Sequence, residues 1–92
     1  MQKTKEKRAI LITGCSSGIG YHVAIELDKL GYQVIASARK MQDVQKLQKL
    51  GLSTIQLDLD DSDSIQNAFQ QTLEISGGCL YALFNNGAYG QP

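Results

Sequence analysis

The sequence lacks tryptophan, has a single proline and two cysteines among its 92 residues, and carries no net charge. Nine basic residues balance nine acidic ones, so nothing favours binding to nucleic acid or to an anionic membrane surface. No apolar run approaches the roughly 20 residues of a membrane span, and the first residues lack the apolar core of a secretory signal. Cys15 and Cys79 do not suggest a disulfide framework. These absences favour a cytoplasmic chain whose partners are neither nucleic acids nor membranes.

What is present is an alternation of strand-like and helix-like segments after a polar leader at residues 1–7. The length suits one small domain with a modest core. Residues 9–12, 33–38, 53–58 and 80–84 read as strands, whereas 19–30, 43–50 and a segment capped by Ser62 read as helices. Gly31, Gly51 and Gly77-Gly78 are placed to end those helices.

Large apolar side chains recur at helical spacing and predict one buried face on each helix. These faces comprise Ile19, Val23, Leu27 and Leu30; Val44, Leu47 and Leu50; and Ile65, Phe69, Thr72 and Leu73. The last strand is a near-continuous apolar run, which predicts a parallel strand covered on both faces.

The pattern βαβαβαβ predicts an α/β fold of Rossmann type, a partial, doubly wound parallel sheet. Parallel strands joined by right-handed helical crossovers are the common way to close such a pattern. The expected strand order is 3-2-1-4. Ligands of this class bind beyond the carboxyl ends of the strands, at the switch between the first and the fourth strand.

A glycine-rich turn, Thr13 to Gly20, joins the first strand to the first helix and predicts a pyrophosphate site. Free backbone N–H groups of a first helical turn carry partial positive charge, and glycine lets the backbone approach a phosphate closely. The glycines stand at 14, 18 and 20, and no lysine follows Gly18 or Gly20, so a nucleoside-triphosphatase loop is disfavoured. The competing interpretation is a turn that binds nothing.

Arg39 follows the second strand, where NAD-binding folds often carry an acid for the adenosine ribose. Ala38 occupies the acid's place, and Lys40 comes next. A guanidinium holds a phosphate through two hydrogen bonds. The sequence therefore predicts NADP(H) as the cofactor, in preference to NAD(H).

The form T-G-x-x-x-G-I-G resembles the short-chain dehydrogenase/reductase family, whose members are NAD(H)- or NADP(H)-dependent oxidoreductases. The resemblance implies that Asp58 accepts a hydrogen bond from the adenine amino group, with the Leu59 backbone against the ring. It also implies that Asn85 pins the sheet beside the cofactor. The Asn86–Gly87 backbone would pack on the adenine ribose, although this chain reads N-N-G-A where the family usually has N-N-A-G.

Together these patterns predict a set of cofactor-binding residues and no metal ligand. The set is Gly14, Ser16, Ser17, Gly18, Ile19, Gly20, Arg39, Asp58, Leu59, Asn85, Asn86 and Gly87.

The resemblance runs from Arg8 to Gly90 and covers only the first half of the family's domain. The family's catalytic Ser, Tyr and Lys would lie beyond position 92, so no catalytic residue is predicted here. Residues 1–92 are thus expected to be the amino-terminal part of the dinucleotide-binding domain of an NADP(H)-dependent reductase. That parent would act on a carbonyl or alcohol substrate. The chain alone would be inactive, and an unpaired fourth strand would favour a homo-oligomer. The alternative is a non-catalytic NAD(P)-binding or sensing module, complete as it stands; a downstream Tyr-x-x-x-Lys would support the reductase.

Overall fold

The computed structural model describes residues 8–16 and 18–85, in which strands and helices alternate. The elements are β1 (Ala9–Ile12), α1 (Gly18–Lys29), β2 (Gln33–Ala38), α2 (Met41–Lys49), β3 (Ser53–Gln56), α3 (Ser62–Ser76) and β4 (Leu80–Phe84). Each predicted element is present. The largest differences are that α2 begins two residues earlier than predicted and that β3 ends two residues earlier.

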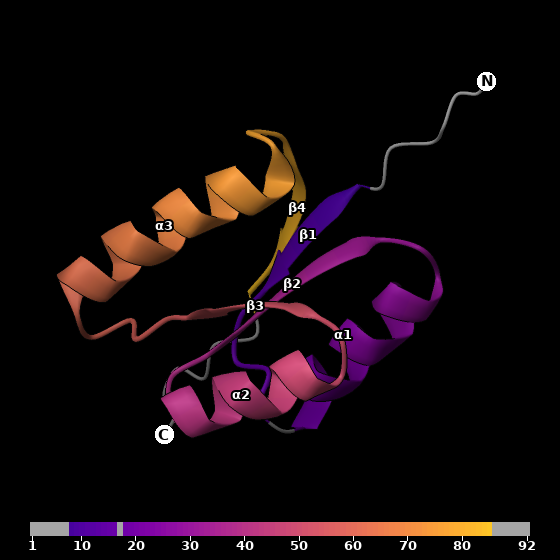
Figure 1. Ribbon diagram of the computed structural model, residues 1–92, viewed down its shortest axis with the longest axis horizontal. Helices are drawn as coiled ribbons and strands as arrows, with labels where there is room; N and C mark the ends of the chain where they lie inside the picture. Colours follow the sequence, from indigo (N-terminus) through magenta and orange to yellow (C-terminus); the bar gives the residue numbers. More distant parts are fainter. Residues whose placement is uncertain (1–7, 17, 86–92) are drawn as a thin grey trace.

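The four strands form one parallel sheet in the order β3-β2-β1-β4, which confirms the predicted topology (Figure 1). The central strand β1 pairs with β2 on one side and with β4 on the other. Ile10, for example, lies between Val34 of β2 and Ala82 of β4. All the carboxyl ends consequently meet at one edge of the sheet.

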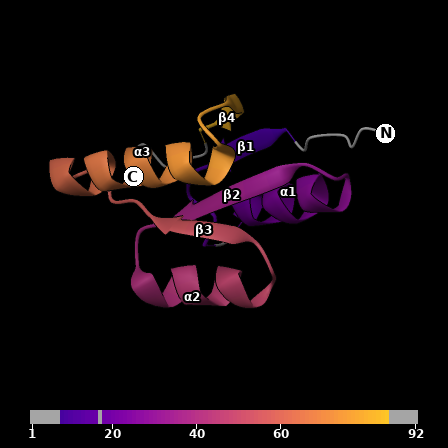
Figure 2. The same cartoon turned by 45° about the horizontal axis from the view of Figure 1, so that its top comes forward.

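The helices cover both faces of the sheet, as a doubly wound fold requires. Figure 2 shows α1 and α2 on one face and α3 on the other. Neighbouring residues of β2 pack against the helices on opposite faces of the sheet, since successive side chains of a strand point to opposite faces. Val34 packs in a cluster with Ala24 of α1 and Leu47 of α2, whereas Ile35 packs with Ala68 of α3.

The predicted apolar face of α1 is wrong in part, because small residues make its closest contacts. Gly20 and Ala24, one helical turn apart, are buried, whereas Ile19 is 67% exposed and Leu30 is 73% exposed. Small side chains let a helix backbone come close to a sheet, and such contacts are not visible in a pattern of large residues. Leu50, placed on the buried face of α2, also lies exposed just beyond the last helical residue.

The predicted cover on both faces of β4 is also wrong for the part of the chain that the structure describes. Leu80, Tyr81, Leu83 and Phe84 are all exposed, so the described residues cover neither face of this edge strand fully. Two residues of the predicted apolar face of α3, Ile65 and Phe69, are exposed as well, while Thr72 is buried. The surface formed by α3 and β4 is therefore only partly covered by the other described residues.

Asp61, and not Ser62, caps the N-terminus of α3. The Asp61 carboxylate accepts hydrogen bonds from the backbone N–H groups of Asp63 at 3.0 Å and Ser64 at 3.4 Å. Both residue types are good N-caps, and the sequence offers them side by side. At the other end Gly77 adopts a left-handed conformation, with φ of 70°, and closes the helix as predicted.

The cap generates a stability prediction. Asp61→Ala should lower the free energy of unfolding by about 1 kcal/mol, because two N–H groups of the first turn lose their acceptor. Ser62→Ala should change it by less than about 0.5 kcal/mol, as is usual for an exposed surface residue. Urea denaturation followed by circular dichroism measures both. Equal effects of the two variants would contradict the assignment of the cap.

Candidate functional site

The candidate site is a pocket of about 250 Å³ at the carboxyl ends of β1, β2 and β3. Its lining consists of Thr13, Gly14, Ser37, Arg39, Leu57, Asp58, Leu59 and Asp60. A larger hollow, of about 650 Å³, opens at the opposite end of the sheet among the loops that lead into the strands. Ligands of open α/β sheets bind at the carboxyl ends, so the smaller pocket is the candidate.

The turn after β1 is fastened to both neighbouring strands. The Thr13 backbone N–H donates to the Phe84 carbonyl at 3.1 Å, and the Thr13 hydroxyl donates to the Asn85 side-chain oxygen at 3.1 Å. On the other side, the Cys15 N–H donates to the Ser37 carbonyl at 2.8 Å. Asn85 thus ties the end of β4 to the end of β1, and its role toward a cofactor remains a prediction.

Cys15 fills the interior of this turn and is not a reactive thiol. Its side chain is fully buried, and the Sγ–H group donates to the Ile12 carbonyl at 3.1 Å. Burial raises the pKa of the Cys15 thiol to about 11, against an opposing effect of the Ser37 backbone hydrogen bond. The thiolate is the nucleophilic form, so the protonated Cys15 serves packing at neutral pH.

Gly18 leaves open space at the start of α1. Its φ is +68°, and no described heavy atom lies within 4 Å of the position that a Cβ would take. The N–H groups of a first helical turn have no partner within the helix, a setting that suits an anionic group. The open space at Gly18 is compatible with the close approach of a pyrophosphate. Gly20, two residues further along α1, is buried.

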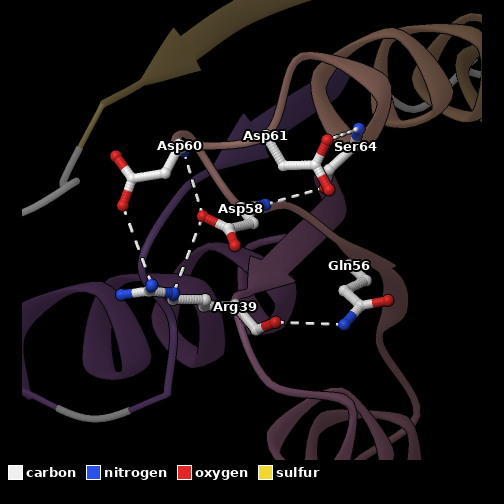
Figure 3. A network of polar contacts seen from close by, with 6 residues as sticks. All are labelled: Arg39, Gln56, Asp58, Asp60, Asp61 and Ser64. Atoms are coloured by element: carbon white, nitrogen blue, oxygen red, sulfur yellow. Dashed lines mark hydrogen bonds and ion pairs between the residues drawn. The ribbon is translucent and has the colours of Figure 1, made fainter.

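Arg39 leaves the end of β2 and points toward the loop that follows β3 (Figure 3). Its Nε lies 3.6 Å from a carboxylate oxygen of Asp58, and its terminal nitrogen lies 3.7 Å from a carboxylate oxygen of Asp60. Both distances exceed those of ordinary hydrogen bonds, so the contacts are loose ion pairs. The arginine side chain is 67% exposed, which leaves it accessible to a ligand.

Asp58 is the fixed member of this group. Its backbone N–H donates to the Ser64 hydroxyl of α3 at 2.9 Å, and its carboxylate accepts from the Asp60 N–H at 3.0 Å. The carbonyl of Arg39 in turn accepts from the Gln56 side chain at 3.1 Å. The loop after β2 is therefore joined directly to the end of β3 and the loop that follows it, and this second loop is joined in turn to α3.

The structure brings together only some of the predicted site residues. Gly14, Arg39, Asp58 and Leu59 line the pocket, whereas Ser16, Gly18, Ile19, Gly20 and Asn85 lie outside its lining. Ser17, Asn86 and Gly87 fall outside the described residues.

Asp60 is absent from the predicted set, yet it lines the pocket and pairs with Arg39. The signal was available: an arginine ending one strand and acids ending the neighbouring parallel strand must meet at the same edge of the sheet.

In residues 8–16 and 18–85, no three His, Cys, Asp or Glu side chains lie together so that they could hold a metal ion. Nor does any helix there have the length and apolar character needed to cross a bilayer.

Comparison with known proteins identifies relatives along nearly the whole chain. An uncharacterized oxidoreductase of Escherichia coli strain K12, YbbO, is 39% identical over 84 residues, which cover 91% of this chain and 31% of YbbO. An NADPH-dependent 1-acyldihydroxyacetone phosphate reductase of Schizosaccharomyces pombe is 40% identical over 81 residues, covering 87% of this chain and 27% of the reductase. The chain thus spans about a third or less of the length of these relatives.

Solved structures show the same architecture. The actinorhodin polyketide ketoreductase in a variant form with NADPH superposes with a TM-score of 0.77 and 26% identity, over 96% of this chain and 36% of the ketoreductase. The menthone neomenthol reductase from Mentha piperita gives the same TM-score and identity, over 92% of this chain and 33% of that enzyme. The model of the family described as short chain dehydrogenase matches residues 8–92. With its parallel 3-2-1-4 sheet and its glycine-rich turn, the chain belongs to the short chain dehydrogenase family.

Proposed function

We propose that this chain is the cofactor-binding part of an NADP(H)-dependent oxidoreductase that acts on a carbonyl or alcohol substrate. The observation that carries the proposal is the placement of Arg39. Arg39 lines a pocket at the carboxyl ends of the strands, on the same sheet edge as the open space beside Gly18 at the start of α1. Family membership supports an oxidoreductase parent. The S. pombe relative named for its NADPH dependence supports the cofactor.

Each part of the cofactor has a counterpart in the site. Gly14 and Gly18 would admit the pyrophosphate to the first turn of α1, together with Ser16, Ser17, Ile19 and Gly20 around the same turn. Asp58 and Leu59 would hold the adenine, Asn85 would pin the end of β4 beside the cofactor, and the Asn86–Gly87 backbone would pack on the adenine ribose. When bound, the nicotinamide supplies or accepts a hydride.

The preference for NADP(H) over NAD(H) rests on two adjacent positions. Ala38 is buried and offers no carboxylate for the ribose hydroxyls, and Arg39 offers a fork that suits a phosphate. A carboxylate at position 38 would instead repel the 2′-phosphate. NAD(H) is the less favoured cofactor.

The parent would be a cytoplasmic enzyme with a small-molecule substrate and no nucleic-acid or membrane partner. Its relatives are about three times as long as this chain, and we place the proton donor and the substrate pocket in the length that the match does not cover. For residues 1–92 alone, homo-oligomer formation is proposed from β4, whose outer edge pairs with no described strand and whose side chains include the exposed Leu83 and Phe84.

The first prediction concerns the 2′-phosphate. Arg39→Ala should weaken NADP(H) binding by about 1.5–3 kcal/mol, the range for hydrogen bonds to a charged group. NAD(H) binding should change little. Calorimetric titration of both cofactors measures the two effects.

Lys46→Ala is the matched control, because Lys46 is also an exposed cation, with an acidic partner at 4.0 Å, and it lies on α2 outside the pocket. It should leave both affinities unchanged. Equal affinity of the unmutated protein for NADP(H) and NAD(H) would refute the assigned preference.

The second prediction separates close approach from backbone strain at Gly18. Gly18→Ala should reduce dinucleotide affinity at least tenfold, because the methyl group enters the space proposed for the pyrophosphate. Gly51→Ala is the control, since Gly51 also has a positive φ and open space around it but lies between α2 and β3. Both variants should lose about 1–2 kcal/mol of stability. Loss of binding in both alike would assign the effect to strain.

The third prediction concerns activity. The 92 residues alone should not reduce carbonyl compounds at a useful rate, because general acid catalysis typically contributes about 10²–10⁴-fold and needs a positioned proton donor. The test is NADPH oxidation over a panel of aldehydes and ketones, run beside light scattering. NADP(H) should nonetheless raise the melting temperature by mass action. Turnover by a clean monomer would contradict both the expected inactivity and the expected self-association of the 92 residues. Cofactor binding without activity in any longer form of the protein would favour the sensing module.

A further inference from the structure

The guanidinium proposed to receive the 2′-phosphate is already paired with two carboxylates of the protein. Asp58 and Asp60 reach Arg39 from the loop after β3, at 3.6 and 3.7 Å (Figure 3). The three side chains line the same pocket. Their formal charges, one positive and two negative, leave the group with a net charge of −1.

The two carboxylates are not equivalent. Asp58 is 31% exposed, and the hydrogen bonds to Ser64 and from the Asp60 N–H fix it at the end of β3. The side chain of Asp60 is 84% exposed, and its ion pair with Arg39 is the contact that the structure gives its carboxylate. Asp58 can therefore stay in place when a ligand binds, whereas the carboxylate of Asp60 is free to turn away.

A phosphate monoester carries a charge of about −1.5 to −2 near neutral pH, so it meets repulsion from any carboxylate that remains beside the arginine. Binding of the 2′-phosphate to Arg39 then exchanges one anionic partner for another. We infer that Asp60 is a specificity-determining residue, which competes with the 2′-phosphate for Arg39 and thereby limits the preference for NADP(H) over NAD(H). The inference deepens the proposed function and rests on it.

The inference predicts a gain of affinity from the loss of a charge. Asp60→Asn keeps the shape of the side chain and the backbone N–H that donates to Asp58, and removes the competing charge. Affinity for NADPH and for adenosine 2′,5′-bisphosphate should rise about threefold to fivefold, as expected for the loss of one exposed ion pair. Affinity for NADH and 5′-AMP should change less than twofold. Titrations at low ionic strength keep the effect measurable.

Two controls make the test specific. Asp63→Asn removes an equal charge from the first turn of α3, outside the pocket, and should give a smaller gain. In the Arg39→Ala background, Asp60→Asn should give no gain, because the competition needs the arginine. An equal gain from Asp63→Asn, or a gain that persists without Arg39, would overturn the inference by assigning the effect to general electrostatics.

The test also separates this inference from the proposed function. If Arg39→Ala weakens NADPH binding but Asp60→Asn leaves it unchanged, Asp60 is not a competitor, and the cofactor preference stands. If Arg39→Ala leaves NADPH binding unchanged, the proposed preference itself fails, and the inference falls with it.

Discussion

The parallel direction of all four strands is the constraint on which the site depends. Parallel neighbours cannot be joined by tight hairpins, so each connection crosses a face of the sheet as a helix. Every strand then ends at the same edge, and the loops after β1, β2 and β3 are brought together there although Gly14, Arg39 and Asp58 lie far apart in sequence. The order β3-β2-β1-β4 adds a second constraint. The connecting helices lie on one face of the sheet for the strands on one side of β1, and on the opposite face for the connection to β4.

Hydrogen bonds at that edge hold the loops against one another. Thr13 joins the end of β1 to Phe84 and Asn85, and Cys15 joins it to Ser37 of β2. The raised pKa of the buried Cys15 thiol belongs to the same arrangement, since a neutral side chain fills the turn without placing a charge in the core. The part of the turn that is fixed in this way does not have to be ordered when a ligand binds, which saves conformational entropy.

The sequence was sufficient for what depends on the backbone and on strand order. Glycines at the turn, helix-ending glycines such as Gly77 and an alternation of strand and helix patterns led to the correct topology. It was insufficient where two choices are chemically alike, as with Asp61 and Ser62 at the cap of α3. The sequence pattern also failed to predict the burial of Gly20 and Ala24, because a prediction from the spacing of large side chains does not consider small residues.

Arg39 shows why side-chain partners at such an edge are hardest to foresee. Its acidic neighbours follow the adjacent strand, and a reading that takes one loop at a time assigns each charge a separate role. An exposed ion pair contributes only about 0–1 kcal/mol, whereas hydrogen bonds to a charged group contribute about 1.5–3 kcal/mol. Pairing with Asp58 and Asp60 can thus orient the guanidinium toward the pocket and still yield to a phosphate. The orientation of Arg39 by the carboxylates favours phosphate binding, whereas their competition for Arg39 opposes it. The balance between the two effects depends on how firmly each carboxylate is held in place.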